Sequence, residues 1–262
     1  MDGVLEIDAD EAWKLVAVAA GGDIATTAAA IAAATAAGST ALAAARRPFT
    51  AEWTVEESRL VIIHKLCQEA APAILENFKP QLMIAIGGGG YVPARILRSF
   101  LKKPGSPNIP IQAIGLSLYE TLSTDATAVE EEPGTKVTRT QWLDLSSLGE
   151  MSNLVGKNIL IVDEVDDTRT TLEYAVKELE KDVELARQKI GPDAAPTKFG
   201  IFVLHNKDKT KKGTLPAAMM EDGRYMAART VGDAWICYPW EATDIEAHDE
   251  AARQAALAAG KQ

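Results

Sequence analysis

Two kinds of hydrophobic pattern alternate along the chain. Continuous apolar runs predict buried β-strands, at 81–86, 109–118, 137–143, 159–162 and 199–204. Apolar residues at helical spacing predict helices, over 55–78 with a break near Pro72, over 94–101 and over 172–189. Strands that alternate with helices in this way are typical of an α/β fold, in which helices flank a parallel sheet.

The strand at 159–162 ends in a dense group of polar residues. Four carboxylates follow it within five residues, Asp163, Glu164, Asp166 and Asp167. The small hydroxyl side chains of Thr168, Thr170 and Thr171 come next, and helical spacing then begins at Leu172. A strand, a polar turn and a helix N-terminus make an anion site, because free backbone N–H groups and the helix dipole point outward there. In α/β sheets, ligands bind at this edge, beyond the carboxyl ends of the strands.

The charges at this turn indicate a metal. Four carboxylates would repel a phosphate unless a cation stood between them, and Arg169 alone cannot balance them. The pattern therefore predicts a hard, oxygen-binding ion, Mg²⁺, carried in with a polyphosphate. The alternative is that the acids merely cap the helix, which a single Asp does well. Four acids directly after a buried strand favour the metal-dependent site.

A second turn of this kind follows the strand at 81–86. The four glycines from Gly87 to Gly90 let the backbone approach a ligand closely, and Pro93 opens the next helix. The turn is not a dinucleotide fingerprint, because Val92 occupies the third glycine position, and no Gly-Lys-Ser/Thr of a P-loop follows. We expect a second strand–loop–helix anion site here.

Composition narrows the classes of function. The 262 residues carry a net charge of -10, which argues against nucleic-acid binding, since such proteins present basic surfaces. Two cysteines without paired spacing fit a reducing, cytoplasmic compartment, and three separated histidines indicate no structural zinc. The alanine-rich stretch before residue 50 is too weakly apolar for a membrane span. We expect a low-complexity extension over 1–50 and one domain over 51–262.

The segment Ile-Val-Asp-Glu-Val-Asp-Asp-Thr-Arg-Thr-Thr at 161–171 resembles the phosphoribosyl-diphosphate (PRPP) signature of the type I phosphoribosyltransferases. The resemblance implies a Rossmann-like parallel sheet with a small hood subdomain. It also implies that Asp163 and Glu164 hold the ribose hydroxyls and help to place Mg²⁺. Asp167 matches the general base beside the purine N7, and Asp166 belongs to the same PRPP-binding segment.

The loop from Asp167 to Thr171 matches the family's binding site for the ribose 5′-phosphate, which gives Thr168, Thr170 and Thr171 that role. Most members have Gly where this chain has Arg169. The fungal purine enzymes are similar to this chain at that position, so we expect Arg169 to reach the phosphate itself.

Two loops resemble further parts of the family's site. Gly88, Gly89 and Gly90 match the loop whose backbone amides receive the leaving diphosphate, although Gly88 replaces the Lys or Arg found in many purine enzymes. Tyr119 matches the catalytic Tyr that leads a flexible lid, here the polar segment 121–136.

The aromatic segment Trp-Ile-Cys-Tyr-Pro-Trp-Glu at 235–241 resembles the purine-binding hood of bacterial xanthine-guanine enzymes. Trp235 would stack on the base, and the backbone of Ile236 would read its edge. A Lys near the end of the preceding strand reads the purine 6-oxo group in related enzymes, and either His205 or Lys207 could do so here. The hood would come mainly from 205–250. A packed core is the alternative for the aromatic rings.

The blocks at 82–119, 137–142, 159–181 and 201–248 resemble the fungal purine phosphoribosyltransferases most. The resemblance implies transfer of phosphoribose from PRPP to a 6-oxopurine, with xanthine ahead of guanine, by a cytoplasmic homodimer without nucleic-acid or membrane partners. Hypoxanthine-guanine transfer is the first alternative. A regulator that binds PRPP or nucleotide without catalysis is the alternative from another class, since fold alone does not decide function.

Overall fold

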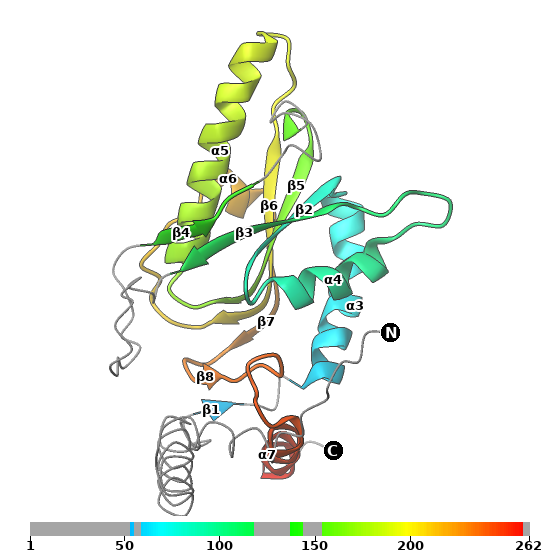
Figure 1. Ribbon diagram of the computed structural model, residues 1–262, viewed down its shortest axis with the longest axis vertical. Helices are drawn as coiled ribbons and strands as arrows, with labels where there is room; N and C mark the ends of the chain where they lie inside the picture. The colour runs from blue at the N-terminus through cyan, green and yellow to red at the C-terminus, as the bar shows by residue number, and fades with distance from the viewer. Residues whose placement is uncertain (1–52, 55–58, 118–136, 144–153, 259–262) are drawn as a thin grey trace, which may run out of the picture. The chain divides into compact units, whose positions relative to one another are not determined.

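The structure, a computed structural model, describes residues 53–54, 59–117, 137–143 and 154–258 (Figure 1). The chain divides into two compact units, 1–51 and 52–262, and every described residue belongs to the second. No helix in the described part of the chain is long and apolar enough to cross a membrane.

A six-stranded sheet with the order β4-β3-β2-β5-β6-β7 is the centre of this unit. Its strands are β2 (Leu82–Gly87), β3 (Ile111–Ser117), β4 (Thr138–Gln141), β5 (Asn158–Asp166), β6 (Lys198–Lys207) and β7 (Tyr225–Val231). All neighbours run parallel except β4, which pairs antiparallel with β3 at the edge. The predicted α/β fold with a parallel sheet is confirmed, with one antiparallel edge strand in addition.

The apolar run at 159–162 is buried on both faces because successive side chains of a strand point in opposite directions. Ile159 and Ile161 pack in the cluster that holds the apolar side of α5 (Thr170–Ile190). Leu160 and Val162 pack on the other face, with α3 (Leu60–Asn77) and α4 (Tyr91–Leu101). Figure 1 shows α5 on one side of the sheet and the α3–α4 pair on the other.

The remaining elements are two short strands and two helices. β1 (Trp53–Thr54) pairs in parallel with β8 (Trp235–Ile236) as a separate two-stranded sheet. α6 (Ala217–Glu221) precedes β7, and α7 (Ile245–Ala258) follows β8. Buried His248 on α7 donates a hydrogen bond from Nε2 to the carbonyl oxygen of Cys237, at 2.9 Å, which ties α7 to the chain after β8.

Three predicted boundaries differ from the structure. The first helix continues through Pro72 without a break, because Pro72 lies on its exposed face, where the carbonyl oxygen that Pro72 cannot bond faces water. β6 extends three residues beyond the predicted end at Leu204, so His205 and Lys207 lie on the strand itself. The strand predicted over 137–143 is limited to Thr138–Gln141.

Candidate active site

The sequence-predicted loops meet because three parallel strands end at the same edge. β5 pairs with β2 on one side, at Leu82↔Ile159, and with β6 on the other, at Ile159↔Phe199. β2 leads at its carboxyl end into the glycine loop 87–90. β5 leads into the phosphate loop 167–171, and β6 ends at Lys207. This edge is where ligands of α/β sheets bind.

The glycine loop packs directly on the acid pair. A Cβ built on Gly89 would overlap the carboxylate of Glu164. A Cβ on Gly90 would lie 2.7 Å from the carbonyl oxygen of Ile86 and would also overlap that of Val162. At Gly90 glycine is required by close approach, since the neighbouring atoms belong to the backbone, whereas a side chain at Gly89 would displace the Glu164 carboxylate. The structure thus brings the predicted diphosphate loop and the predicted ribose-binding acids together.

Burial keeps both acids of the pair close to neutrality. Burial, together with repulsion from Asp166, raises the pKa of Asp163 to about 7, although the Glu164 N–H donates to its Oδ1 at 2.9 Å. Burial, followed by repulsion from Asp163 and Glu241, raises the pKa of Glu164 to about 8. Two adjacent carboxylates taken out of water favour protonation unless a cation joins them.

The two acids could hold such a cation. Carboxylate oxygens suit Mg²⁺, which in phosphate-using sites takes one or two protein carboxylates and fills its remaining positions with substrate oxygens and water. Among the described residues, no group of three or more His, Cys, Asp or Glu side chains is arranged to hold a metal. The donor set therefore fits an ion shared between Asp163, Glu164 and a bound substrate.

The phosphate loop ends in a left-handed residue. Arg169, the N-cap of α5, has φ 69°, a conformation that favours glycine. Its Nε donates a hydrogen bond to Asp166 Oδ2 at 2.9 Å, and its Nη2 lies 2.9 Å from the same oxygen in an ion pair. The guanidinium lies 4.9 Å from the centroid of the Tyr225 ring. These contacts turn the side chain toward Asp166, and its predicted contact with the phosphate stays a prediction.

Asp166 supports the loop from behind. Its side chain is fully buried, and the Tyr225 hydroxyl donates to Oδ2 at 2.6 Å. The structure thus directs Asp166 away from the open edge, and its predicted contact with PRPP stays a prediction. The remaining loop residues, Thr168, Thr170 and Thr171, are partly buried at the start of α5, with the Thr168 and Thr170 hydroxyls 3.0 Å apart.

Lys211 braces this loop against the end of β6. Its ammonium group donates to the carbonyl oxygens of Asp166 (2.7 Å), Asp167 (2.9 Å) and Lys207 (2.8 Å). It also lies 3.6 Å from Asp166 Oδ1. Sequence reasoning missed Lys211, because nothing in the charged stretch 205–213 distinguishes it from its neighbours.

Lys207, rather than His205, lies beside the predicted base-stacking ring. The Lys207 ammonium is 5.7 Å from the centroid of the Trp235 ring and 3.7 Å from Asp167 Oδ1. Lys209 and Asp233 complete this charged group, since Lys209 Nζ lies 2.8 Å from Asp167 Oδ1 and 2.6 Å from Asp233 Oδ1. Trp235 is 41% exposed, so a base has access to its ring.

His205 points elsewhere. It is fully buried, its Nδ1 lies 2.8 Å from the Tyr238 hydroxyl, and burial lowers the pKa of the imidazole to about 4. The Tyr238 hydroxyl in turn donates to the backbone carbonyl of Glu164 at 3.2 Å. The neutral imidazole thus belongs to a hydrogen-bonded chain that ends on the acid pair.

The aromatic segment forms a second hydrogen bond to Glu164, through Trp240. The indole Nε1 of Trp240 donates to Glu164 Oε2 at 2.7 Å, and its ring stacks on Tyr238 with centroids 4.8 Å apart. Tyr238 and Trp240 were not among the predicted site residues. The Trp-Ile-x-x-Pro-Trp spacing was the available signal, but it does not reveal a partner 76 residues away. Ile236 is buried beside them, and Tyr119 lies outside the described residues.

Comparison with known proteins agrees with this geometry. The chain is 60% identical to the hypoxanthine-guanine phosphoribosyltransferase of Schizosaccharomyces pombe over 187 residues, which covers 71% of this chain and 89% of that protein. It is 57% identical to xanthine phosphoribosyltransferase 1 of Saccharomyces cerevisiae over 188 residues, with the same coverage of 71% and 89%. No family model matches the chain.

A solved structure shows a similar fold. A hypothetical protein from Neisseria gonorrhoeae, solved with bound ppGpp, superposes with a TM-score of 0.56 and 38% identity over 75% of this chain and 94% of its own. The identities to the two fungal enzymes extend over most of the length of those enzymes. The chain therefore belongs to the purine phosphoribosyltransferases, a family of glycosyltransferase enzymes.

Proposed function

We propose that this enzyme converts a 6-oxopurine, with xanthine first and guanine second, and PRPP to the purine nucleoside 5′-monophosphate and diphosphate. The observation that carries the proposal is the grouping of Asp167, Lys207 and the Trp235 ring at the carboxyl edge of the sheet. A proton acceptor, a cationic donor and a stacking surface are what recognition of an oxopurine needs. The relatives at 57% and 60% identity act on xanthine or on hypoxanthine and guanine, so identity alone does not rank the bases.

Each side chain has one task in this reaction. Trp235 holds the purine so that N9 faces C1 of the ribose, and Lys207 donates to the 6-oxo group. Asp167 accepts the hydrogen bond or the proton of N7, a general-base role typically worth about a hundredfold or more. His205 lies too deep to read the base and instead orients Tyr238.

The phosphates and ribose lie along the same edge. Backbone amides of 168–171 and the α5 dipole hold the 5′-phosphate, Asp163 and Glu164 bind the ribose hydroxyls, and amides of Gly88–Gly90 receive the diphosphate. Asp163 and Glu164 would hold Mg²⁺, which would supply positive charge for the leaving diphosphate. The family also implies a cytoplasmic homodimer, which light scattering on the purified chain would test.

Turnover of xanthine, guanine, hypoxanthine and adenine with Mg²⁺ and PRPP tests the proposal. We expect xanthine to give the highest kcat/KM, and Asp167→Ala to lose about a hundredfold or more in kcat. Asp208→Ala is the matched control, because Asp208 is exposed directly after β6 and no ion pair among the described residues involves it. Higher kcat/KM for hypoxanthine would favour the hypoxanthine-guanine alternative.

One observation favours a second candidate function. The relative from N. gonorrhoeae was solved with bound ppGpp, so a nucleotide-binding regulator without turnover is the alternative. Binding of PRPP without product formation from any of the four bases would establish that alternative and reject the enzyme reaction.

A further inference from the structure

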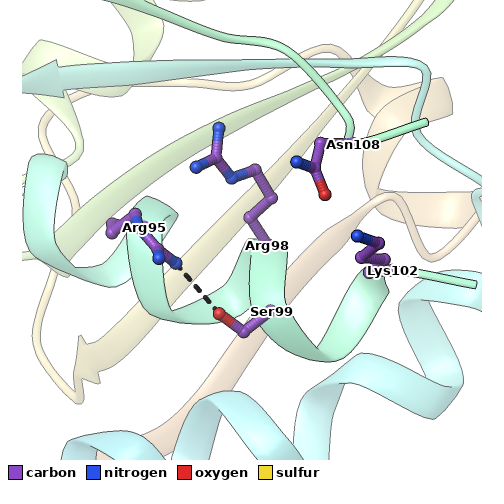
Figure 2. A pocket seen from close by; sticks show the side chains of 5 residues that line it. All are labelled: Arg95, Arg98, Ser99, Lys102 and Asn108. Atoms are coloured by element: carbon purple, nitrogen blue, oxygen red, sulfur yellow. Dashed lines mark hydrogen bonds between the residues drawn. The ribbon is translucent and has the colours of Figure 1, made fainter.

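A basic pocket lies on α4, outside the proposed active site. It is a cavity of about 310 Å³ lined by Arg95, Arg98, Ser99, Lys102 and Asn108. Figure 2 shows the Arg98 side chain rising from the middle of the helix between Arg95 and Asn108, with Lys102 at the far end. Arg95 and Arg98 come from successive turns of α4, Lys102 is the C-cap residue that follows it, and all three cations line the same pocket.

The two arginines of this pocket are unlike the other arginines of the described chain. Seven arginines lie within 4.0 Å of a carboxylate oxygen, namely Arg59, Arg139, Arg169, Arg187, Arg224, Arg229 and Arg253. Arg95 and Arg98 have no such partner among the described residues. The one side-chain hydrogen bond in the pocket runs from Arg95 Nη1 to the neutral hydroxyl of Ser99, at 2.9 Å.

The charge of the whole chain makes this cluster notable. With 37 acidic and 27 basic residues, acidic partners are in excess, yet no ion pair among the described residues involves Arg95, Arg98 or Lys102. Like charges on successive turns of a helix repel one another and destabilise it. A bound anion would remove that repulsion.

We propose that the Arg95–Lys102 pocket binds a small polyphosphate anion. The planar guanidinium of an arginine can donate two parallel hydrogen bonds to the oxygens of one phosphate, and the ammonium of Lys102 adds a positive charge on a flexible side chain. Asn108 faces the same space from the segment before β3 and can supply an amide donor. The volume of about 310 Å³ is at the lower limit for ligand pockets, which fits a di- or triphosphate group rather than a larger ligand.

This pocket is distinct from the predicted diphosphate loop. α4 begins at Tyr91, directly after the glycine loop, whereas Lys102 follows its last residue, Leu101. Eleven helical residues rise about 16 Å, so the two anion sites lie toward opposite ends of one helix. Free diphosphate and the phosphate chain of a purine nucleotide are the two sources of the ligand.

The first test measures protection of Lys102 on the intact chain. The protein is acylated with a lysine-directed reagent with and without inorganic diphosphate or a purine nucleoside triphosphate, and each lysine is quantified by peptide mass spectrometry. Acylation of Lys102 should slow about tenfold at an anion concentration ten times Kd, because only the unbound pocket reacts. Exposed Lys177 on α5 is the internal control and should react at an unchanged rate.

The two anions distinguish the sources of the ligand. Protection by diphosphate shows that phosphates suffice, whereas protection by the triphosphate alone shows that the nucleoside is also recognised. Unchanged acylation of Lys102 with both anions, up to concentrations that saturate the active site, would overturn the proposal.

A second test uses variants and calorimetry. Arg95→Ala/Lys102→Ala should lose one binding step for the anion and keep the step that belongs to the active site. Lys177→Ala/Lys189→Ala removes the same charge from exposed positions of α5 and should keep both steps. Equal binding by the two double variants would also overturn the proposal.

Discussion

Glu164 is the residue on which the most separate parts of the site converge. Gly89 packs on its carboxylate, Trp240 donates to Oε2, and Tyr238 donates to its backbone carbonyl. The aromatic segment that carries the predicted purine-stacking Trp235 therefore also holds an acid of the PRPP motif. This arrangement predicts that Trp240 positions Glu164 for PRPP although it touches no reacting atom.

Trp240→Phe tests that role, because Phe keeps an aromatic ring beside Tyr238 and removes the indole N–H together with the five-membered ring that carries it. A hydrogen bond to a charged group is worth about 1.5–3 kcal/mol, so Mg²⁺-PRPP should bind about tenfold more weakly or worse. Titration calorimetry measures this directly, and KM for the purine should change little. Trp142→Phe is the matched control, since Trp142 donates a similar bond, of 2.9 Å, to Asp182 away from the site.

If the wild-type chain binds Mg²⁺-PRPP and Trp240→Phe binds it equally well, the positioning role is wrong while the proposed function stands. If the wild-type chain does not bind it at all, the proposed function itself fails.

The acid pair also predicts how stability depends on pH without metal. In the folded chain the pKa is about 7 for Asp163 and about 8 for Glu164, whereas unfolded Asp and Glu titrate near 3.9 and 4.3. Between these values the folded chain holds more protons, so the stability from both groups is complete below about pH 4 and is lost as pH rises toward 8. The melting temperature should fall over this window.

Because other groups also titrate over this window, the melting temperature of the wild type is compared with that of Asp163→Asn/Glu164→Gln. The two amide side chains of this variant cannot ionise. The variant should gain in melting temperature relative to the wild type as pH rises from 5 to 8.5, in a metal-free buffer. Parallel curves for the two proteins would show that the acids are not near-neutral in the folded chain.

At the scale of elements, the glycine loop can be dissected one position at a time. Gly90→Ala places a Cβ against backbone carbonyls of β2 and β5, which cannot move, so a large loss of stability is expected. Gly89→Ala meets the end of the Glu164 side chain, which can shift, so PRPP binding should weaken more than stability. Gly88→Ala meets nothing within 4 Å and should leave the melting temperature unchanged. Thermal unfolding and PRPP titration of the three variants would check this order.

The elements themselves were largely predictable, because hydrophobic period and the turn residues are local signals. The strand at 159–162, the helix after it and both anion loops follow from such signals. What could not be predicted are contacts between distant segments. The bond from Arg169 to Asp166 and its approach to the ring of Tyr225, 56 residues on, belong to these contacts, and the expected contact of Arg169 with the phosphate stays a prediction. Lys211 likewise donates hydrogen bonds to carbonyl oxygens 45 and 44 residues before it, and the local sequence does not reveal such distant partners.

At the scale of the whole molecule, every described part of the site lies within residues 52–262. The fungal relatives cover 71% of the chain, so about 75 of its 262 residues lie outside the shared region, which is more than the length of 1–51. Removal of 1–51 should therefore leave the melting temperature and kcat/KM close to those of the full chain. Calorimetry and turnover of the shortened chain measure both, and loss of either would assign a folding or catalytic role to the removed segment.

A slightly longer deletion should act on one substrate only. β1 contributes the backbone of Trp53 and Thr54 to the strand that carries Trp235 and Ile236, through the register Trp53↔Trp235 and Thr54↔Ile236. Removal of 1–58 takes away this two-stranded sheet but leaves the six-stranded sheet, which holds the acid pair and the phosphate loop. We therefore expect KM for the purine to rise while Mg²⁺-PRPP still binds with its original affinity. Equal loss for both substrates would mean that β1 supports the whole unit, and no loss would mean that β8 holds its position without β1.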